Sequence, residues 1–111
     1  MMASLEDFSK IDVRCGRVIE VLPFPEARKP AYRMLIDFGP AIGTRTSCAQ
    51  LPANYAEAEL KGRLVSCVVN FPPRRVGPAL SEVLVLGFPD EQGNAVLVSP
   101  DREVPVGGRL F

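Results

Sequence analysis

Apolar and polar residues alternate in short segments along the chain, which is the pattern of half-buried β-strands. The clearest case is residues 32–38, where Tyr32, Met34, Ile36 and Phe38 fall on one face. Five further strands are predicted, at residues 13–22, 44–49, 63–70, 82–87 and 95–99. Glycine and proline residues separate these segments, which is typical of a small all-β domain.

In the first predicted strand, Val13, Cys15, Ile19 and Val21 share one face. Arg17 is the exception on that face, and Gly16 is expected to mark a bulge or a bend. The loop at Asp90–Asn94 is predicted to join the last two strands as a hairpin.

Two short helices are predicted. Ser4–Asp7 resembles a capping box with Asp in place of the usual Glu, so a helix is expected to run to about Lys10. Residues 51–60 are rich in Ala and Glu and are followed by Lys61-Gly62, a typical helix end. Short strands with one central helix predict a five-stranded Greek-key barrel with additions at both ends, forming one domain over residues 1–111.

The composition places the chain among globular proteins: it has 111 residues, 47% of them hydrophobic. No apolar run approaches the roughly 18 residues of a membrane span, and the acidic N-terminus does not resemble a signal peptide. Cys15, Cys48 and Cys67 form an odd set without CxxC spacing, so we expect reduced thiols and a cytoplasmic protein.

Histidine is absent from the chain. The usual general base and the usual metal ligand are therefore missing. The carboxylates are scattered, and no GxxxxGK[ST] loop is present. We expect no enzymatic activity, no catalytic residue, no metal site and no cofactor.

The net charge of zero conceals an uneven distribution. Residues 14–75 carry ten Lys or Arg and five acidic residues, whereas the segments before and after them are acidic. Ten of the thirteen basic residues are arginine, which binds phosphate in a planar fork and stacks on bases. The pattern is compatible with one nucleic-acid-binding face, and a solvated surface would give the same numbers.

The segment from Asn70 to Gly87 contains Arg74-Arg75 directly after Pro72-Pro73. Proline fixes φ and provides no backbone donor, so the two arginines are expected on a stiff, extended segment. Guanidinium groups held in this way bind phosphate with little loss of conformational entropy. The alternative is a pair that only solvates a loop.

Five segments together carry a family resemblance: residues 12–18, 24–31, 46–50, 69–75 and 81–87. Over about residues 7–111 the chain resembles the CsaA family, small dimeric proteins with the OB-type tRNA-binding domain that is also appended to some aminoacyl-tRNA synthetases. The chain departs from the family pattern at Cys48, where a second serine is expected, and at Pro78-Ala79-Leu80. The resemblance implies an OB-fold and binding of tRNA or another folded RNA.

We predict an RNA-binding set of basic and small polar residues: Arg14, Arg28, Lys29, Arg33, Ser47, Asn70, Arg74, Arg75, Ser81 and Glu82. Arg14 is preferred to Arg17 on the resemblance, because the two point to opposite faces of one strand. Ser47 and Asn70 are equally compatible with a capping role. Glu82 repels phosphate, so it is expected to bind a base amino group or, preferably, an internal arginine.

Aromatic residues are few, with no Trp and two Tyr, and this favours recognition of a folded RNA by shape over base stacking. The resemblance also implies a second function, a chaperone linked to protein export that binds unfolded or precursor polypeptides. Apolar loop residues for that function are Phe24, Phe71, Pro72 and Leu80. A purely structural dimerisation domain is the third interpretation.

A homodimer is expected through the two extensions. The chain ends in Leu110-Phe111, and its N-terminal segment carries Leu5, Phe8 and Ile11. A monomer would leave these side chains in water. The alternative is that both ends fold onto their own barrel.

Overall fold

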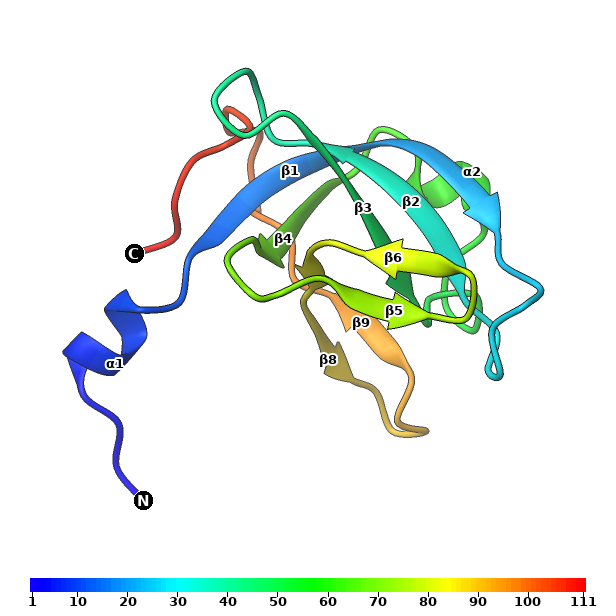
Figure 1. Ribbon diagram of the computed structural model, residues 1–111, viewed down its shortest axis with the longest axis horizontal. Helices are drawn as coiled ribbons and strands as arrows, with labels where there is room; N and C mark the ends of the chain where they lie inside the picture. Colours follow the sequence, from blue (N-terminus) through cyan, green and yellow to red (C-terminus); the bar gives the residue numbers. More distant parts are fainter.

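A five-stranded sheet in the order β3-β2-β1-β4-β7 forms the body of the protein. The structure is a computed structural model that describes residues 1–111. The strands of this sheet are β1 (Val13–Pro23), β2 (Tyr32–Asp37), β3 (Thr44–Ala49), β4 (Leu64–Val68) and β7 (Leu84–Val85). All pairs in it are antiparallel. Figure 1 shows the long, curved β1 crossing the top of the molecule.

The sheet curls into a nearly closed barrel. The amides of Glu82 and Val83 both donate to the carbonyl of Thr46 in β3, at 2.8 and 3.4 Å. Because β7 follows at once and pairs with β4, this segment joins the two outer strands of the sheet. The prediction of an all-β barrel of the OB type is confirmed.

Strand β1 differs in register from the prediction. Val18 is fully buried whereas Ile19 is 38% exposed, and the bulge lies between Val18 and Glu20. Gly16 stays in the ladder opposite Val65. The predicted bulge at Gly16 is therefore wrong, because the extra residue falls at Ile19 and shifts the register there. Of the predicted apolar face, Val13 is buried and Val21 packs against the hydrophobic core, whereas Ile19 is exposed.

Gly16 has a packing role instead. A Cβ at this position would lie 2.6 Å from Cγ2 of Ile36 and 2.7 Å from the ring of Phe38. These distances are too short for any real side chain, so the missing Cβ lets β2 and its continuation pack directly on β1. Ile36 and Phe38 thereby reach the centre of the barrel, as the alternating pattern predicted.

The main core fills the barrel with side chains from every strand of the sheet and from the segment after β3. Its fully buried members include Val18, Met34, Ile36, Phe38, Leu60, Val65 and Cys67. The predicted helix at 51–60 is shorter than expected: α2 is Glu57–Leu60, and the preceding residues form turns. Leu60 is the residue of α2 that enters the core.

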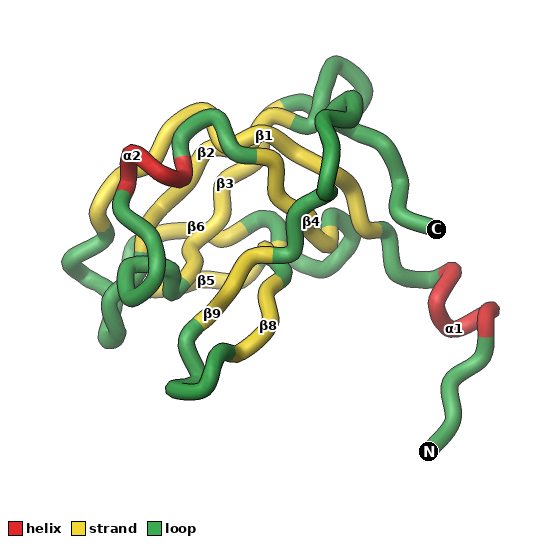
Figure 2. Tube along the Cα trace, turned by 180° about the vertical axis from the view of Figure 1, so that it is seen from behind, coloured by secondary structure: helices red, strands yellow, loops and turns green.

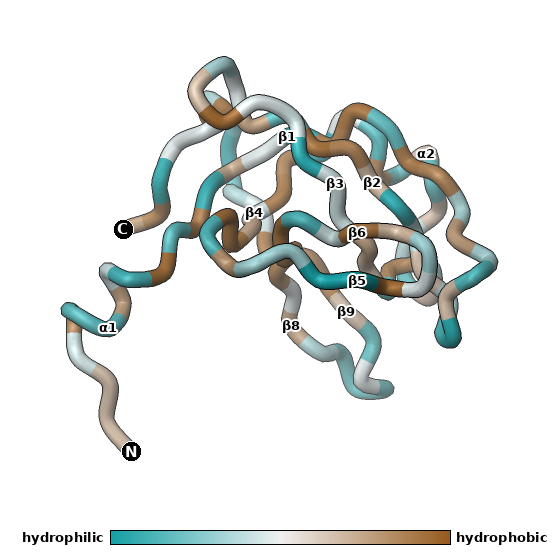
Figure 3. Tube along the Cα trace, in the orientation of Figure 1, coloured by the Kyte–Doolittle hydropathy of each residue, from teal (hydrophilic) through white to brown (hydrophobic).

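Two small hairpins are added to the barrel. One consists of β5 (Arg74–Val76) and β6 (Ala79–Ser81), and the other of β8 (Gly87–Pro89) and β9 (Ala95–Leu97). The sequence pattern predicted β8–β9 in part. It placed Arg74-Arg75 on an extended segment but predicted no strand there, so β5–β6 is a correction. Figure 3 shows hydrophilic β5 beside apolar β6, in front of the barrel.

The two ends of the chain meet at one side of the barrel. Helix α1 (Leu5–Ser9) has the predicted capping box between Ser4 and Asp7 and no buried residue. Figures 1 and 2 show α1 standing away from the body, on the side where the C-terminal segment also ends. That segment pairs with β1 through Cys15, Gly107 and Gly108. Neither α1 nor α2 has the length and apolar character that a membrane-spanning helix requires.

Candidate nucleic-acid interface

A second, smaller core positions the basic segments. Phe24 and Ala31, at the two ends of the loop after β1, pack with Ala79 of β6. The turn at Gly77 lies against this loop, so that a Cβ there would be 3.7 Å from the ring of Phe24. The loop and the β5–β6 hairpin are 50 residues apart in sequence, and this packing places them side by side.

A groove with a volume of about 650 Å³ lies between this unit and the base of the β8–β9 hairpin. Its rim carries Arg28 and Lys29 from the loop and Arg74 and Arg75 from β5. Glu26 is the one acidic residue in the lining. The floor is aliphatic and comes mainly from the ends of β3, β7 and β9, with Ala49, Leu51, Leu84, Val85, Leu86, Ala95 and Leu97.

The four rim cations have no acidic partner within the protein, whereas Arg14, Arg17 and Arg109 are all ion-paired. All four are exposed. Unpaired, exposed cations that converge on one groove create a positive potential that attracts polyanions. The structure thus brings together four of the ten residues predicted for RNA binding.

Arg33 lies close to this unit on the outer face of β2. Its guanidinium is 5.6 Å from the centre of the Phe24 ring, and it stands opposite Cys48 of β3. Burial raises the pKa of the Cys48 thiol, and the positive charges of Arg33 and Arg74 oppose this increase. Cys48, the departure from the family pattern, is therefore part of the groove wall between two arginines.

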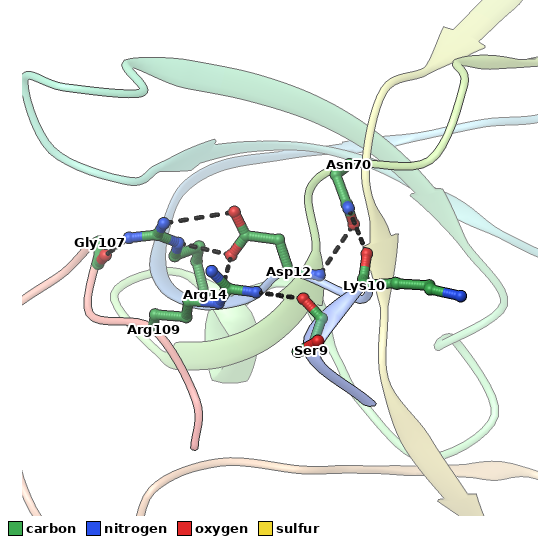
Figure 4. A network of polar contacts seen from close by, with 7 residues as sticks. All are labelled: Ser9, Lys10, Asp12, Arg14, Asn70, Gly107 and Arg109. Atoms are coloured by element: carbon green, nitrogen blue, oxygen red, sulfur yellow. Dashed lines mark hydrogen bonds and ion pairs between the residues drawn. The ribbon is translucent and has the colours of Figure 1, made fainter. Parts of the chain in front are cut away.

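Arg14 and Asn70 hold the chain ends instead of facing the groove (Figure 4). Arg14 donates to both carboxylate oxygens of Asp12, at 2.6 and 3.2 Å, and to the carbonyl of Gly107 at 2.9 Å. These hydrogen bonds, with the charges of Arg14 and Arg109, hold the pKa of Asp12 below its ordinary value.

Asn70 completes this network from the end of β4. Its side chain accepts from the amide of Asp12 at 2.9 Å and donates to the carbonyl of Lys10 at 2.8 Å. Arg109 donates to the carbonyl of Ser9. The alternative arginine, Arg17, is paired with Glu103. The network therefore ties α1, β1, β4 and the C-terminal segment together.

Ser47, Ser81 and Glu82 close the barrel. Ser47 is buried and donates to the carbonyl of Val83 at 3.0 Å. Ser81 is also buried, and its hydroxyl accepts from the amide of Cys48 at 3.0 Å. Glu82 accepts from the amide and the hydroxyl of Thr46, so its predicted internal arginine partner is wrong. These three side chains therefore form hydrogen bonds within the protein instead of facing the groove.

The four apolar candidates for peptide binding differ in how exposed they are in the structure. Phe24 is 3% exposed within the second core, so the prediction that it forms part of a loop surface is wrong. Phe71 and Leu80 remain 44% and 45% exposed, and Pro72 is exposed as well. Leu80 stands opposite Arg75 in the β5–β6 hairpin.

The sequence analysis missed the floor of the groove and Gln50, which lines it directly after β3. Alternation within single strands does not show which strand ends meet. Gln50 also carries no local signal, since an exposed Gln after a strand is common.

Comparisons with known proteins agree with this architecture. Residues 13–109 match the family described as "Putative tRNA binding domain". The chain is 45% identical to the chaperone CsaA of Bacillus anthracis, with a TM-score of 0.94 and both chains fully covered. The CsaA chaperone protein of Picrophilus torridus is 44% identical, with a TM-score of 0.91, over 99% of this chain and 100% of that one.

Among longer relatives, a methionine–tRNA ligase of Porphyromonas gingivalis is 36% identical over 107 residues. The match covers 96% of this chain and 15% of the ligase. The chain thus spans about a seventh of the length of that relative. By its match over residues 13–109 and its likeness to CsaA at full length, the chain belongs to the tRNA-binding domain family and, within it, to the CsaA proteins.

Proposed function

We propose that this protein binds tRNA at the groove between the 24–31 loop, β5 and β9, acts without catalysis, and works as a homodimer in the cytoplasm. The observation that carries the proposal is the convergence of Arg28, Lys29, Arg74 and Arg75 on one groove without an acidic partner for any of them. Two distant segments supply these cations, and a dedicated core holds the segments together. Family membership supports the choice of tRNA.

The test is a double substitution, Arg74→Ala with Arg75→Ala. Charge-assisted phosphate contacts contribute about 1.5–3 kcal/mol each, so tRNA affinity should fall at least tenfold, about 1.4 kcal/mol. The thermal midpoint should change by only a few degrees, because exposed arginines add little to folding.

The matched control removes the same charge elsewhere, with Lys61→Ala and Arg102→Ala. Both residues are exposed and neither lines the groove. Equal loss of affinity in the two double variants would show that binding depends on net charge and not on the groove. Unchanged affinity in the Arg74/Arg75 variant would reject the groove as the binding site.

The dimer is supported by apolar surface at the chain ends. Leu5, Phe8, Leu110 and Phe111 are all exposed, and exposed apolar side chains that gather in one region of a surface mark interaction sites. A hollow of about 420 Å³ is lined by Leu110 and Phe111 together with Val13, Val98, Val104 and Pro105 among others. Sedimentation should show a dimer at micromolar concentration, and the double variant Leu5→Ser, Phe8→Ser should shift it toward monomer. A wild-type monomer would reject the proposal.

Binding of unfolded polypeptides is the second candidate function. It is favoured by the exposed Phe71, Pro72 and Leu80 around the basic rim and by the description of the two CsaA relatives as chaperones. An unfolded, permanently denatured protein should then compete with tRNA, and Leu80→Ser should weaken the polypeptide more than the tRNA. Simultaneous binding of both ligands would show that the polypeptide binds at a surface other than the tRNA groove.

A further inference from the structure

The floor of the groove has a composition that phosphate binding does not require. Eleven of the nineteen lining residues are apolar. Phosphates would be satisfied by the rim cations alone, and they gain nothing from an aliphatic surface. A ligand that matches the whole groove has an apolar, flat part for the floor and anionic parts for the rim.

We infer that the groove holds one unpaired nucleobase of the RNA, with its neighbouring phosphates on the rim, and that Gln50 determines which base is preferred. This inference rests on the proposed RNA binding and deepens it. A nucleotide is the RNA component that combines an apolar ring face with a flanking anion on each side. The volume of about 650 Å³ lies within the range of clefts that enclose small organic ligands, roughly 300–1,000 Å³.

A base in a helix is not available for this site. In a duplex the ring faces are stacked and the phosphates form the outer surface, so a helix would contact Arg28, Lys29, Arg74 and Arg75 and leave the floor empty. Sequence-specific proteins instead bind RNA loops, bulges and ends, where bases are splayed out and pack against side chains. The rim arginines also provide planar groups that stack on a base.

Gln50 is the one uncharged side chain in the lining with both a strong donor and a strong acceptor. It lies between Ala49 and Leu51, and both of those line the floor. A glutamine amide donates and accepts at once, and it matches adenine at N6 and N7 in a bidentate manner. We therefore expect a preference for adenine.

The experiment measures binding of end-labelled RNA nonamers by fluorescence anisotropy at fixed salt. The ligands are U4AU4, U4CU4 and U9, with a blunt RNA duplex of nine base pairs as the paired competitor. U4AU4 should bind at least about fivefold tighter than U9, the lower end of the discrimination of a bidentate base contact. Gln50→Ala should abolish this difference. The matched control is Gln92→Ala, because Gln92 is the other glutamine and lies in the β8–β9 turn, outside the groove.

Occupancy of the groove is read from the native thiols. Cys48 lines the groove, whereas Cys15 lines the hollow at the chain ends. Saturating U4AU4 should slow the maleimide labelling of Cys48 severalfold and leave that of Cys15 unchanged, as measured by peptide mass spectrometry. The wild type should also prefer the single strand to the duplex.

Equal affinity for the duplex and the single strand, together with unprotected Cys48, would overturn the inference while leaving RNA binding at the rim intact. Protection of Cys48 with equal affinity for all nonamers, unchanged by Gln50→Ala, would overturn the role of Gln50. Failure to bind tRNA and every nonamer would reject the proposed function itself, so the two failures are distinguishable.

Discussion

At the scale of single residues, Asp12 joins three parts of the chain. It accepts from the guanidinium of Arg14, lies 3.6 Å from that of Arg109, and donates through its amide to Asn70. Because the pKa of this carboxyl is below its ordinary value of 3.8, its contribution to stability is present above that value. The contribution is lost as the pH falls through the lower, folded-state pKa.

We predict that Asp12→Asn lowers the thermal midpoint at neutral pH and flattens its decline below about pH 4, where the wild-type carboxyl becomes protonated. Calorimetry between pH 2 and pH 6 gives both profiles. Glu91→Gln is the control, because Glu91 is exposed and makes no ion pair. If the thermal midpoint declines equally steeply with falling pH in wild type and Asp12→Asn, other carboxylates determine the loss of stability in acid.

Gly16 is the second residue on which the barrel depends. Gly16→Ala would place a methyl group 2.6–2.9 Å from Ile36 and Phe38, both in the core, so the strands must separate. Overpacking of this kind costs about 1–3 kcal/mol, measurable by urea unfolding. Gly108→Ala, whose Cβ meets nothing closer than 3.6 Å, should cost much less. Equal stability of the two variants would mean that β1 adjusts freely.

At the scale of elements, the second core decides whether the groove exists. Phe24 is its largest member, and it holds the 24–31 loop against the β5–β6 hairpin. We predict that Phe24→Ala weakens tRNA binding at least tenfold, since it frees Arg28, Lys29 and β5 to move apart. The accompanying loss of stability is about 3 kcal/mol, the lower end for a buried Phe.

Hydrogen exchange separates this effect from general unfolding. In Phe24→Ala, the protection of backbone amides from exchange should fall in residues 24–31 and 74–81, whereas the amides of β1, β2 and β4 should stay protected. Phe88→Ala is the control, because Phe88 is largely exposed on the other hairpin. Uniform loss of protection across the barrel would show that the second core is not an independent unit.

The elements also show which features a sequence reveals. Strand β2 was predictable because its alternation has one exception only, Leu35, and the capping box of α1 is a local signal. The β5–β6 hairpin was not, because its strands have three residues each and β5 directly follows two prolines. The candidate site divides in the same way: basic loops were visible, whereas Ser47, Ser81 and Glu82 form hydrogen bonds with residues 33 to 36 positions away. Such pairings depend on barrel closure.

At the scale of the whole molecule, the number of grooves sets the response to salt. Each protomer offers four rim cations, and a homodimer would offer eight. Binding of cations to phosphates releases counterions, so log affinity falls with log salt by about 0.7–0.9 for each phosphate neutralised. One groove therefore predicts a slope of about −3 to −4, and two grooves on a single tRNA predict about −6 to −7.

We expect the steeper slope for the dimer, and the shallower one for the double variant Leu5→Ser, Phe8→Ser, which loses the apolar contacts of α1 but keeps its own groove. Anisotropy titrations of one labelled tRNA between 50 and 300 mM KCl give both values, with the oligomeric state checked by sedimentation under the same conditions. A dimer with a slope near −3 would mean that each tRNA engages one groove and that the second protomer binds another molecule. A slope near zero in either protein would show that phosphate contacts do not drive binding, because no other contribution to this interface depends so strongly on salt.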